Sequence, residues 1–389
     1  MKRIRRVLIF IELMHKTNIR PRWGRTNIRE MIIYKHVIPS GFFIVSNSYA
    51  ILACILLVGQ SCQKDQPPVK DDTATITGSK RVFITNEGNF NWGNASLSLY
   101  NPDNNTVTAD IYKTNNNNNP LGDVCQSMTR HNNALLVVVN NSHKVIALNY
   151  QTYIKEHEIT GLNSPRYILP VSNSKAYISD LYNNTIYIAD LNTWSVSATI
   201  PCKGWTEEMA LSYGKAFVCN RKSNYLYVIN TASDQVTDSI AVGYGSSSIQ
   251  KDKNEKLWVL CSGSSSLNQL PKLVRVNPLN NQVELSLVFT ANDSPGNLQL
   301  NGAGDHIYYL NHGVYTMHIA DLNLPASAFI SEGTKIYYGI GIDPEDETIY
   351  VSDAIDYVQK GKIERYTPTG IYINTFTAGI TPGSFYFQY

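Results

Sequence analysis

The sequence predicts an all-β chain built from one short unit that recurs along its length. The unit is clearest between Lys175 and Ile200, where three runs rich in Val, Ile, Thr and Tyr are separated by turns of Asn, Asp and Ser. Apolar and polar residues alternate within these runs, so each predicted strand has one face to bury. A meander of three or four strands cannot bury that face alone. The unit must therefore stack against copies of itself.

An apolar run that ends in Asn, Asp or Cys marks each copy of the unit. The seven final residues, at intervals of 54, 40, 40, 41, 50 and 42 residues, are Asn86, Asn140, Asp180, Asn220, Cys261, Asn311 and Asp353. A period of roughly 40–45 residues with four short strands is typical of a β-propeller blade. Helical solenoids share this period, but no amphipathic helical run lies between these positions. We therefore predict a seven-bladed β-propeller of four-stranded antiparallel blades over residues 80–389.

The first blade lacks an innermost strand at the N-terminal side. Its predicted strands are Arg81 to Asn86, Ser96 to Tyr100 and Thr106 to Lys113, whereas the chain ends with one strand too many, Ser384 to Gln388. We predict that this C-terminal strand completes the first blade and closes the ring, which leaves no long free sheet edge. The other blades are predicted at Val124 to Ile159, Arg166 to Ile200, Met209 to Val242, Ser248 to Val288, Leu298 to Ile330 and Gly339 to Phe376.

The region before the propeller is predicted to be an export signal. Residues 1–30 have no fold pattern and are interpreted as an N-terminal extension, with Met31 as the working start. Residues 31–61 place an apolar run before Gly-Gln-Ser-Cys62, as in a lipoprotein signal peptide, which makes Cys62 the predicted lipidation site. A transmembrane anchor is the alternative, but polar residues interrupt the run, and a span needs about 20 apolar residues. Residues 62–79 are polar and aperiodic, which predicts a flexible tether.

The charge distribution argues against a nucleic-acid partner. The chain has a formal charge of +2, but residues 1–35 alone carry ten Lys and Arg against two Glu. The chain from Cys62 onward is therefore net acidic, whereas nucleic-acid binding needs a basic surface.

One face of the predicted propeller carries the elaborated loops. Connections between the second and third strands share a face with those that join blades, and the longest are residues 87–94, 262–271 and 354–361. Binding residues concentrate on such loops, and the mixture of aromatic and hydrogen-bonding groups suits a large amphipathic small molecule or a glycan. The predicted ligand-binding residues are Phe90, Trp92, Arg166, Tyr182, Trp205, Glu207, Arg221, Tyr244, Asn297, Tyr338 and Tyr357.

Neither a metal centre nor a catalytic site is predicted. Asn and Asp at the strand ends resemble a ring of metal ligands, but these residues commonly bond to the backbone of a following turn. His143 and His312 occupy equivalent turns in distant blades, and no nucleophile, zinc or phosphate-loop motif is present. We therefore expect a protein that is not an enzyme and has no cofactor.

The repeat resembles the YVTN/YncE-like β-propellers, through Tyr-Ile-Ser-Asp-Leu-Tyr-Asn-Asn-Thr-Ile-Tyr-Ile-Ala-Asp (177–190) and Val-Ser-Ala-Thr-Ile-Pro (196–201). Several segments are similar to the lipoprotein branch of the Bacteroidetes: Asn-Glu-Gly-Asn-Phe (86–90), Leu-Gly-Asp-Val (121–124), Ser-Pro-Arg-Tyr (164–167) and Asp-Ala-Ile-Asp-Tyr-Val-Gln-Lys-Gly (353–361). Cys-Gln-Lys-Asp (62–65) resembles the short signals that direct some of these lipoproteins to the cell surface.

The resemblance implies a surface lipoprotein of the outer membrane. That branch includes proteins that capture cobalamin and deliver it to a TonB-dependent outer-membrane transporter, so cobalamin and such a transporter are the expected ligand and partner. Two alternatives stay open. The first is a surface propeller that binds glycans or proteins without a small ligand. The second is a metal-dependent propeller lyase or hydrolase.

Overall fold

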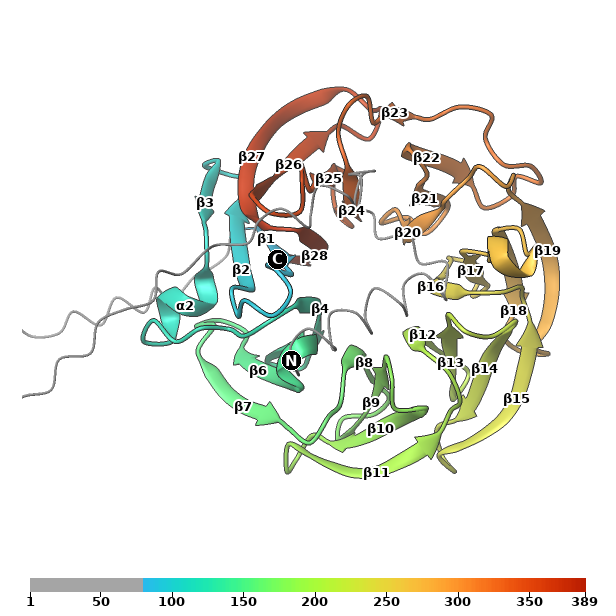
Figure 1. Ribbon diagram of the computed structural model, residues 1–389, viewed down its shortest axis with the longest axis horizontal. Coiled ribbons are helices and arrows are strands. Elements are labelled where there is room, and N and C mark those ends of the chain that lie inside the picture. The colour runs from blue at the N-terminus through green and yellow to red at the C-terminus, as the bar shows by residue number, and fades with distance from the viewer. Residues whose placement is uncertain (1–79) are drawn as a thin grey trace, which may run out of the picture.

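The computed structural model describes residues 80–389, which form seven four-stranded antiparallel sheets arranged around a central axis (Figure 1). The predicted seven-bladed propeller is therefore confirmed. The predictions for residues 1–79, including lipidation of Cys62, lie outside the described residues. Within the described part of the chain, no helix has the length and apolar character needed to cross a membrane.

Each blade runs from an inner strand at the axis to an outer strand at the rim. Blade 1 comprises β28 (Pro382–Gln388), β1 (Arg81–Asn86), β2 (Ser96–Asn101) and β3 (Thr106–Thr108), and blade 2 comprises β4 (Cys125–His131), β5 (Ala134–Val139), β6 (Lys144–Asn149) and β7 (Lys155–Ile159). Blade 3 comprises β8 (Pro165–Pro170), β9 (Lys175–Asp180), β10 (Thr185–Asp190) and β11 (Ser195–Pro201). Blade 4 comprises β12 (Thr206–Ser212), β13 (Lys215–Asn220), β14 (Tyr225–Asn230) and β15 (Gln235–Ala241).

Blades 5 to 7 follow the same order. Blade 5 comprises β16 (Ser246–Lys251), β17 (Leu257–Cys261), β18 (Lys272–Asn277) and β19 (Gln282–Val288). Blade 6 comprises β20 (Gly296–Leu300), β21 (His306–Leu310), β22 (Gly313–His318) and β23 (Ile330–Ser331). Blade 7 comprises β24 (Tyr337–Ile342), β25 (Ile349–Asp353), β26 (Lys360–Tyr366) and β27 (Tyr372–Ile380). Short helical segments are α2 (Ile111–Asn115), η1 (Asn140–Ser142) and η2 (Ser265–Leu267).

The hydrophobic core lies between neighbouring blades. Leu136 and Val138 of β5, for example, share a buried cluster with Ala176 and Ile178 of β9 in the next blade. The second strand of each blade is buried on both faces, which explains its continuous run of Val, Ile, Leu and aromatic residues. Because each blade covers its neighbours, blades 1 and 7 become fully buried only when the ring closes.

The C-terminal strand closes the ring as predicted. β28 pairs antiparallel with β1, with Val82 opposite Phe387 and Ile84 opposite Phe385. The rings of Phe385 and Phe387 lie 6.0 and 5.4 Å from that of Tyr350 in blade 7. The first blade therefore contains both ends of the described chain, and its innermost strand also packs against blade 7.

The outer part of blade 1 differs from the prediction. Thr106 to Lys113 was expected to be one strand, but β3 ends at Thr108 and α2 follows. Asp110 ends the strand because its side chain accepts a hydrogen bond from the Lys113 N–H (3.1 Å) and so caps the helix. The asparagine run (residues 115–119) begins at the last residue of α2. It lies at the outer rim, since Asn115 and Asn116 donate to the carbonyls of Thr152 and Tyr153 in the β6–β7 turn. It therefore does not join the loops at the centre of the face.

The Asn and Asp residues at the ends of second strands have structural partners, as expected. Asp180 accepts hydrogen bonds from the N–H groups of Tyr182 and Asn183 at 2.8 and 2.7 Å. Asn140 instead donates to Ser164 and Pro165, where the chain enters the next blade. These side chains fix the turns and blade connections on one face of the propeller.

Candidate functional site

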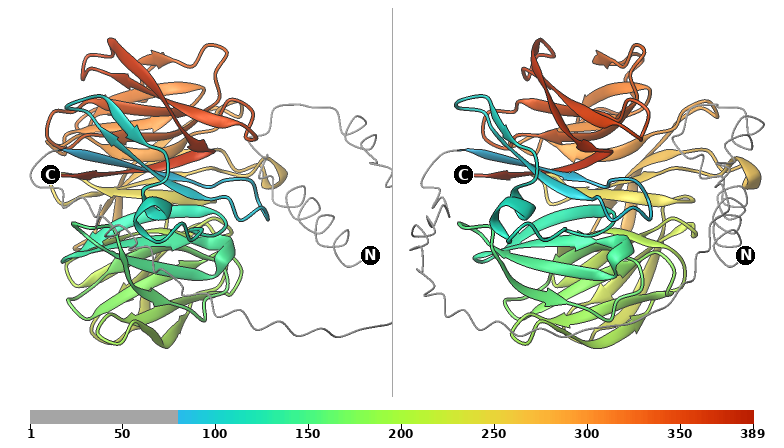
Figure 2. Two further views of the ribbon diagram at one scale, coloured as in Figure 1. Left: turned by 90° about the vertical axis from the view of Figure 1, so that its left-hand side faces the viewer. Right: turned by 60° about the vertical axis from the view of Figure 1, so that its left-hand side comes forward.

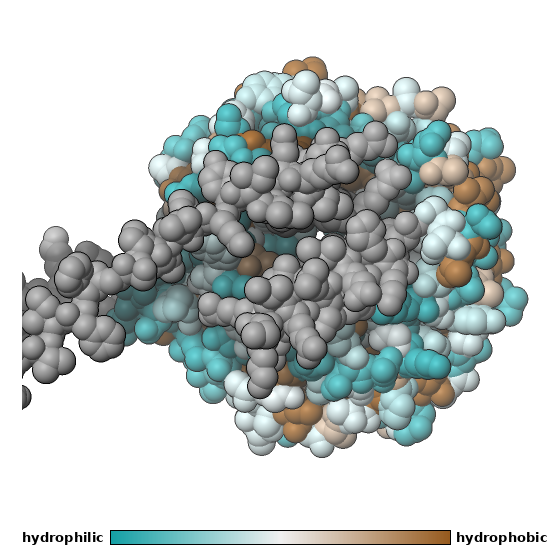
Figure 3. Space-filling model, in the orientation of Figure 1, coloured by the Kyte–Doolittle hydropathy of each residue, from teal (hydrophilic) through white to brown (hydrophobic). Residues whose placement is uncertain are grey.

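One face of the propeller carries both the long loops and the entrance to the central axis. The β1–β2 loop (residues 87–95) and the β17–β18 loop with η2 project from the side opposite the C-terminus (Figure 2). Figure 1 views the molecule from this side, which we call the loop face. Around the grey atoms in Figure 3, the visible surface is mostly hydrophilic, with separate hydrophobic patches. The visible outer part of the loop face thus presents mainly polar side chains.

Seven β-bulges form a ring at the axial end of the loop face. Near its start, every inner strand pairs out of register with the second strand, so one residue is extra. The residues at these equivalent positions are Gln126, Arg166, Glu207, Ser247, Asn297, Tyr338 and Gly383. A bulge redirects its side chain away from the normal alternation of a strand. We call these seven residues the bulge ring.

Blades 2 to 4 supply a charged half of the bulge ring. Arg166 makes two hydrogen bonds to the carboxylate of Glu207, both 3.1 Å, and its guanidinium also donates to the side-chain oxygen of Gln126. Glu207 is only 2% exposed. This pairing raises the pKa of Arg166 above its usual value against the opposing effect of burial. Arg166 and Glu207 therefore form a fixed ion pair that connects three blades.

Trp205 lies beside this ion pair, between two arginines. Its ring is 5.9 Å from the guanidinium of Arg166 and 5.1 Å from that of Arg221. Both distances are within the range of cation–π attraction. The sequence prediction thus grouped residues that are in contact, because Arg166, Trp205, Glu207 and Arg221 form one cluster.

Blades 6, 7 and 1 supply a less charged half of the ring. The Tyr338 hydroxyl donates to Glu87 at 2.7 Å, and the Asn297 amide donates to the Tyr338 carbonyl. The Tyr357 ring meets the Tyr338 ring edge-on at 5.6 Å. Tyr357 is only 6% exposed. Tyr357 therefore packs against Tyr338 and does not expose its ring to a ligand.

The remaining predicted aromatic residues lie in loops and turns rather than on the inner strands. Phe90 and Trp92 are 45% and 77% exposed in the β1–β2 loop, and Tyr182 is 50% exposed in the β9–β10 turn. Tyr244 is half-buried in the connection between β15 and β16. The β1–β2 loop that carries Phe90 and Trp92 is held by the Asn89 side chain, which donates to the Tyr357 carbonyl at 3.1 Å. The exposed rings thus come from two loops of the loop face, in blades 1 and 3.

Acidic groups dominate the electrostatics below the ring. Glu208 follows Glu207 on β12 and accepts a hydrogen bond from the Ile249 N–H of the next blade at 3.0 Å. Burial, with a smaller contribution from Glu207, raises the pKa of Glu208 to about 8. Burial also raises the pKa of Tyr167 well above its usual value, and Glu208, Glu207 and Glu87 add to this effect. The axial end of the loop face thus holds three acidic side chains, those of Glu87, Glu207 and Glu208, together with Arg166.

The sequence prediction omitted several residues of this site, namely Glu87, Gln126, Ser247 and Gly383. The bulge-ring residues of blades 2 to 7 lie 13–15 residues before the strand-end residue of the same blade, as Gln126 precedes Asn140 and Arg166 precedes Asp180. Alignment of the repeats on those strand ends would therefore have found them. Within residues 80–389, no group of three or more His, Cys, Asp or Glu side chains is placed to hold a metal ion.

Together, the seven blades and the bulge ring define a propeller with a chemically varied entrance on its loop face. The chain belongs to the family described as domain of unknown function DUF5074, whose model matches residues 80–380. None of the curated proteins matches the sequence.

Solved structures share the architecture at low sequence identity. A quinonprotein alcohol dehydrogenase-like protein from Bacteroides thetaiotaomicron is 12% identical over 79% of this chain and 78% of its own, with a TM-score of 0.62. Hydrazine synthase from Kuenenia stuttgartiensis is 14% identical over 66% of this chain and 87% of its own, with a TM-score of 0.53. Apo AztD from Citrobacter koseri is 9% identical over 80% and 98%, with a TM-score of 0.51. This likeness extends to the fold alone.

Proposed function

We propose that the protein is a binding protein that captures a large hydrogen-bonding small molecule on its loop face. The observation that carries this proposal is the bulge ring, which brings seven different blades to one axial site with side chains of unlike chemistry. A repeat that served only to close the ring would have no need of such variety. The exposed rings of Phe90, Trp92 and Tyr182 add apolar area around these polar groups.

Cobalamin is the ligand we propose to test first. It offers a wide, partly apolar surface edged with amides, which aromatic rings cover and Arg, Glu, Asn and Gln side chains hydrogen-bond. The sequence resemblance to the Bacteroidetes lipoproteins supports the same choice. In this proposal the protein acts by binding without catalysis, and a lipid on Cys62 holds it at the cell surface. It then delivers its ligand to a TonB-dependent outer-membrane transporter.

Gel filtration of purified protein mixed with cobalamin tests the proposal. The coloured ligand should elute with the protein at one equivalent, and Arg166→Ala should abolish this co-elution. A colourless protein peak at micromolar ligand would rule out cobalamin.

Membrane fractionation of Cys62→Ala tests the anchor separately, since the variant should move to the soluble fraction. Pull-down with the wild-type lipoprotein in detergent should retain a TonB-dependent transporter.

A further inference from the structure

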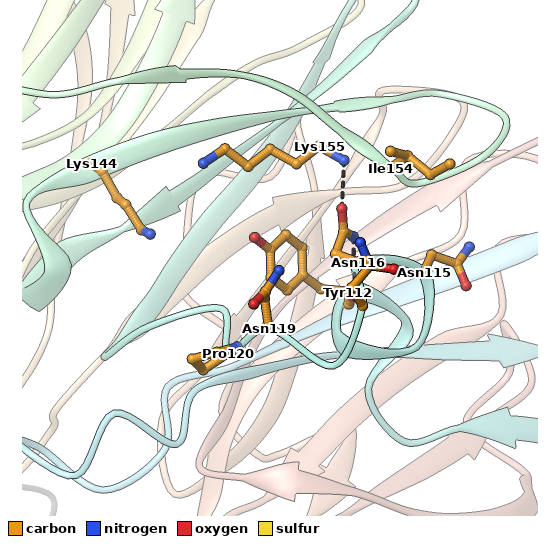
Figure 4. Close-up of a pocket in the computed structure, with 9 residues that line it drawn as sticks. Tyr112, Asn115, Asn116, Asn119, Pro120, Lys144, Ile154 and Lys155 are labelled. Carbon is orange, nitrogen blue, oxygen red and sulfur yellow. Dashed lines mark hydrogen bonds between the residues drawn. The ribbon is translucent and has the colours of Figure 1, made fainter. Parts of the chain in front are cut away.

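A second concave site lies at the outer rim, between blades 1 and 2. It is a pocket of about 480 Å³ bordered by α2, the asparagine run and the first residues of β6 and β7 (Figure 4). This volume is within the range of about 300–1,000 Å³ found for small-molecule sites. α2 lies at the rim in Figure 1, whereas the bulge ring lies at the axis. The pocket is therefore separate from the site proposed above.

The walls of the pocket are fixed by hydrogen bonds. Asn116 is buried, donates to the carbonyls of Tyr112 and Tyr153 at 2.8 and 3.0 Å, and accepts from the Lys155 N–H at 2.7 Å. Asn115 donates to the Thr152 carbonyl at 2.7 Å. These two asparagines join the α2 segment to blade 2. The walls of the pocket are consequently held in place by hydrogen bonds between the α2 segment and blade 2.

The side chains that line the pocket are polar and mostly cationic or amide. Figure 4 shows the Tyr112 side chain between Asn119 and the two lysines, Lys144 and Lys155. Lysine supplies three hydrogen-bond donors, the amide of Asn supplies both donors and acceptors, and the Tyr hydroxyl supplies one of each. Such a lining is poorly suited to an apolar ligand. It matches a molecule with several hydroxyl groups.

Two of the side chains that line the pocket are cationic, those of Lys144 and Lys155. Glu158 lies 2.6 Å from the Lys155 ammonium and 3.5 Å from that of Lys144. Asp110 and Lys113 at the start of α2 add one charge of each sign. A single carboxylate thus serves two ammonium groups. An anionic group in the pocket would find a cation that is only partly neutralised.

We propose that this pocket binds an acidic sugar unit, one that carries a carboxylate on a polyhydroxylated ring. Lys144 and Lys155 bind the carboxylate, whereas Asn119 and the Tyr112 hydroxyl bind ring hydroxyls. The size of the pocket, the donors on its walls and its two ammonium groups, which share one carboxylate, all favour this class of ligand. The inference does not depend on what the loop face binds.

Calorimetric titration with three probes tests the proposal. Glucuronate should bind, glucose should bind at least about tenfold more weakly because it lacks the charge, and inorganic sulfate should also bind more weakly because it lacks the hydroxyls. Binding of glucuronate should weaken as salt rises, since the contact is partly exposed. Equal binding of glucose would overturn the role of charge. Equal binding of sulfate would overturn the sugar, and absence of glucuronate binding at millimolar concentration would overturn the site.

Variants with opposite expected signs exclude a folding effect. Lys155→Gln should weaken glucuronate binding about tenfold, whereas Glu158→Gln removes the competing carboxylate and should strengthen it several-fold. Lys251→Gln is the matched control, because Lys251 also pairs with a glutamate (2.8 Å to Glu255) but lies in blade 5. A loss of binding in all three variants would show that the pocket is not the site.

Discussion

The two faces of the propeller use the same strands but differ in what their loops do. On the face opposite the loop face, the lysines that begin the second strands of blades 3 and 4 reach the turn of the next blade. Lys175 bonds to Asp234 and to the Thr231 carbonyl, both at 2.7 Å, and Lys215 bonds to the Pro278 carbonyl and Asn281, both at 3.0 Å. One contact thus recurs from blade to blade.

On the loop face, the equivalent positions carry different side chains, and their contacts do not recur. Arg166–Glu207 joins blades 3 and 4, whereas Tyr338–Glu87 joins blades 7 and 1 through another chemistry. The opposite face therefore repeats one contact in blades 3 and 4, whereas each contact described on the loop face is of a different kind. Substitutions on the first should lower stability, and substitutions on the second should lower binding.

Removal of Pro382–Tyr389 should produce the largest effect. The deletion takes away β28, its ladder to β1 and the packing of Phe385 and Phe387 against Tyr350. The lost contacts should exceed the net stability of a typical domain, which is about 5–15 kcal/mol. We expect an aggregated or unfolded product by gel filtration and circular dichroism. A truncated protein that melts within a few degrees of the full chain would contradict the closure argument.

Asp343→Ala should destabilise the protein by about 3 kcal/mol, because it removes one partner of a buried ion pair. Asp343 is fully buried on the opposite face and bonds to Lys80 and to the hydroxyl of Tyr389, which are next to the two strands that close the ring. Asp346→Ala is the control, since Asp346 also pairs with Lys80 but its side chain is 54% exposed. Urea denaturation should show less than about 1 kcal/mol for the control. Equal losses would assign the effect to Lys80 alone.

Gly383→Leu should block the loop face without unfolding the protein. Gly383 is the bulge-ring residue that lacks a side chain, and a Cβ there would meet Glu87 at 3.4 Å and Tyr338 at 3.7 Å, which are ordinary contacts. A Cβ is therefore accommodated, and a leucine side chain built on it would extend among these groups. We expect cobalamin affinity to fall about 100-fold, or about 2.7 kcal/mol. Gly383→Ala should bind nearly normally, and an unaffected Leu variant would place the ligand elsewhere.

The fold was predictable because it rests on local patterns that repeat. Alternation within strands, turn residues and a constant interval between strand ends require no knowledge of distant contacts. The exception was α2, where Asp110 ends the strand and caps a helix within a single turn. A segment of mixed Thr, Ala and Tyr fits either structure. The choice depends on its packing against the β6–β7 turn, which the sequence does not show.

The candidate site was only partly predictable. Arg166, Glu207, Asn297 and Tyr338 were selected from loop positions, and the structure places all four in the bulge ring. The remaining residues of the bulge ring are Gln126, Ser247 and Gly383. Gln126 and Ser247 are neither charged nor aromatic, and Gly383 has no side chain, so none of the three indicates a binding site in the sequence. The partnership of Glu87 with Tyr338 joins residues 251 positions apart, and only closure of the ring brings them together.

Trp92→Ala and Trp205→Ala should each weaken cobalamin binding by about 2 kcal/mol, roughly 30-fold, as truncation of an aromatic anchor does. The two variants should differ in stability. Trp92 is 77% exposed, so the melting temperature of its variant should not change, whereas Trp205 lies within 6 Å of two guanidinium groups (5.9 and 5.1 Å), so its variant should show a small decrease. Asn104→Ala, in a short turn of the opposite face, is the control for binding. Wild-type affinity in both tryptophan variants would remove the aromatic residues from the proposed site.

Glu208→Gln should change the stability of the protein by an amount that depends on pH. Burial raises the pKa of Glu208 from an ordinary 4.5 to about 8, so the folded protein prefers the protonated acid. The associated stability is fully present below about pH 4.5 and is lost as pH rises through 8, where the folded protein must carry the buried charge. Gln resembles the protonated acid and can still accept the Ile249 hydrogen bond. Urea denaturation should therefore show equal stabilities of variant and wild type at pH 4.5, and a variant more stable by on the order of 2 kcal/mol at pH 9.

Glu255→Gln, at an exposed turn, should give the same difference at both pH values. A Glu208→Gln difference that stays constant with pH would mean that the carboxylate is solvated in the folded protein, and the axis below the bulge ring would then be open to water.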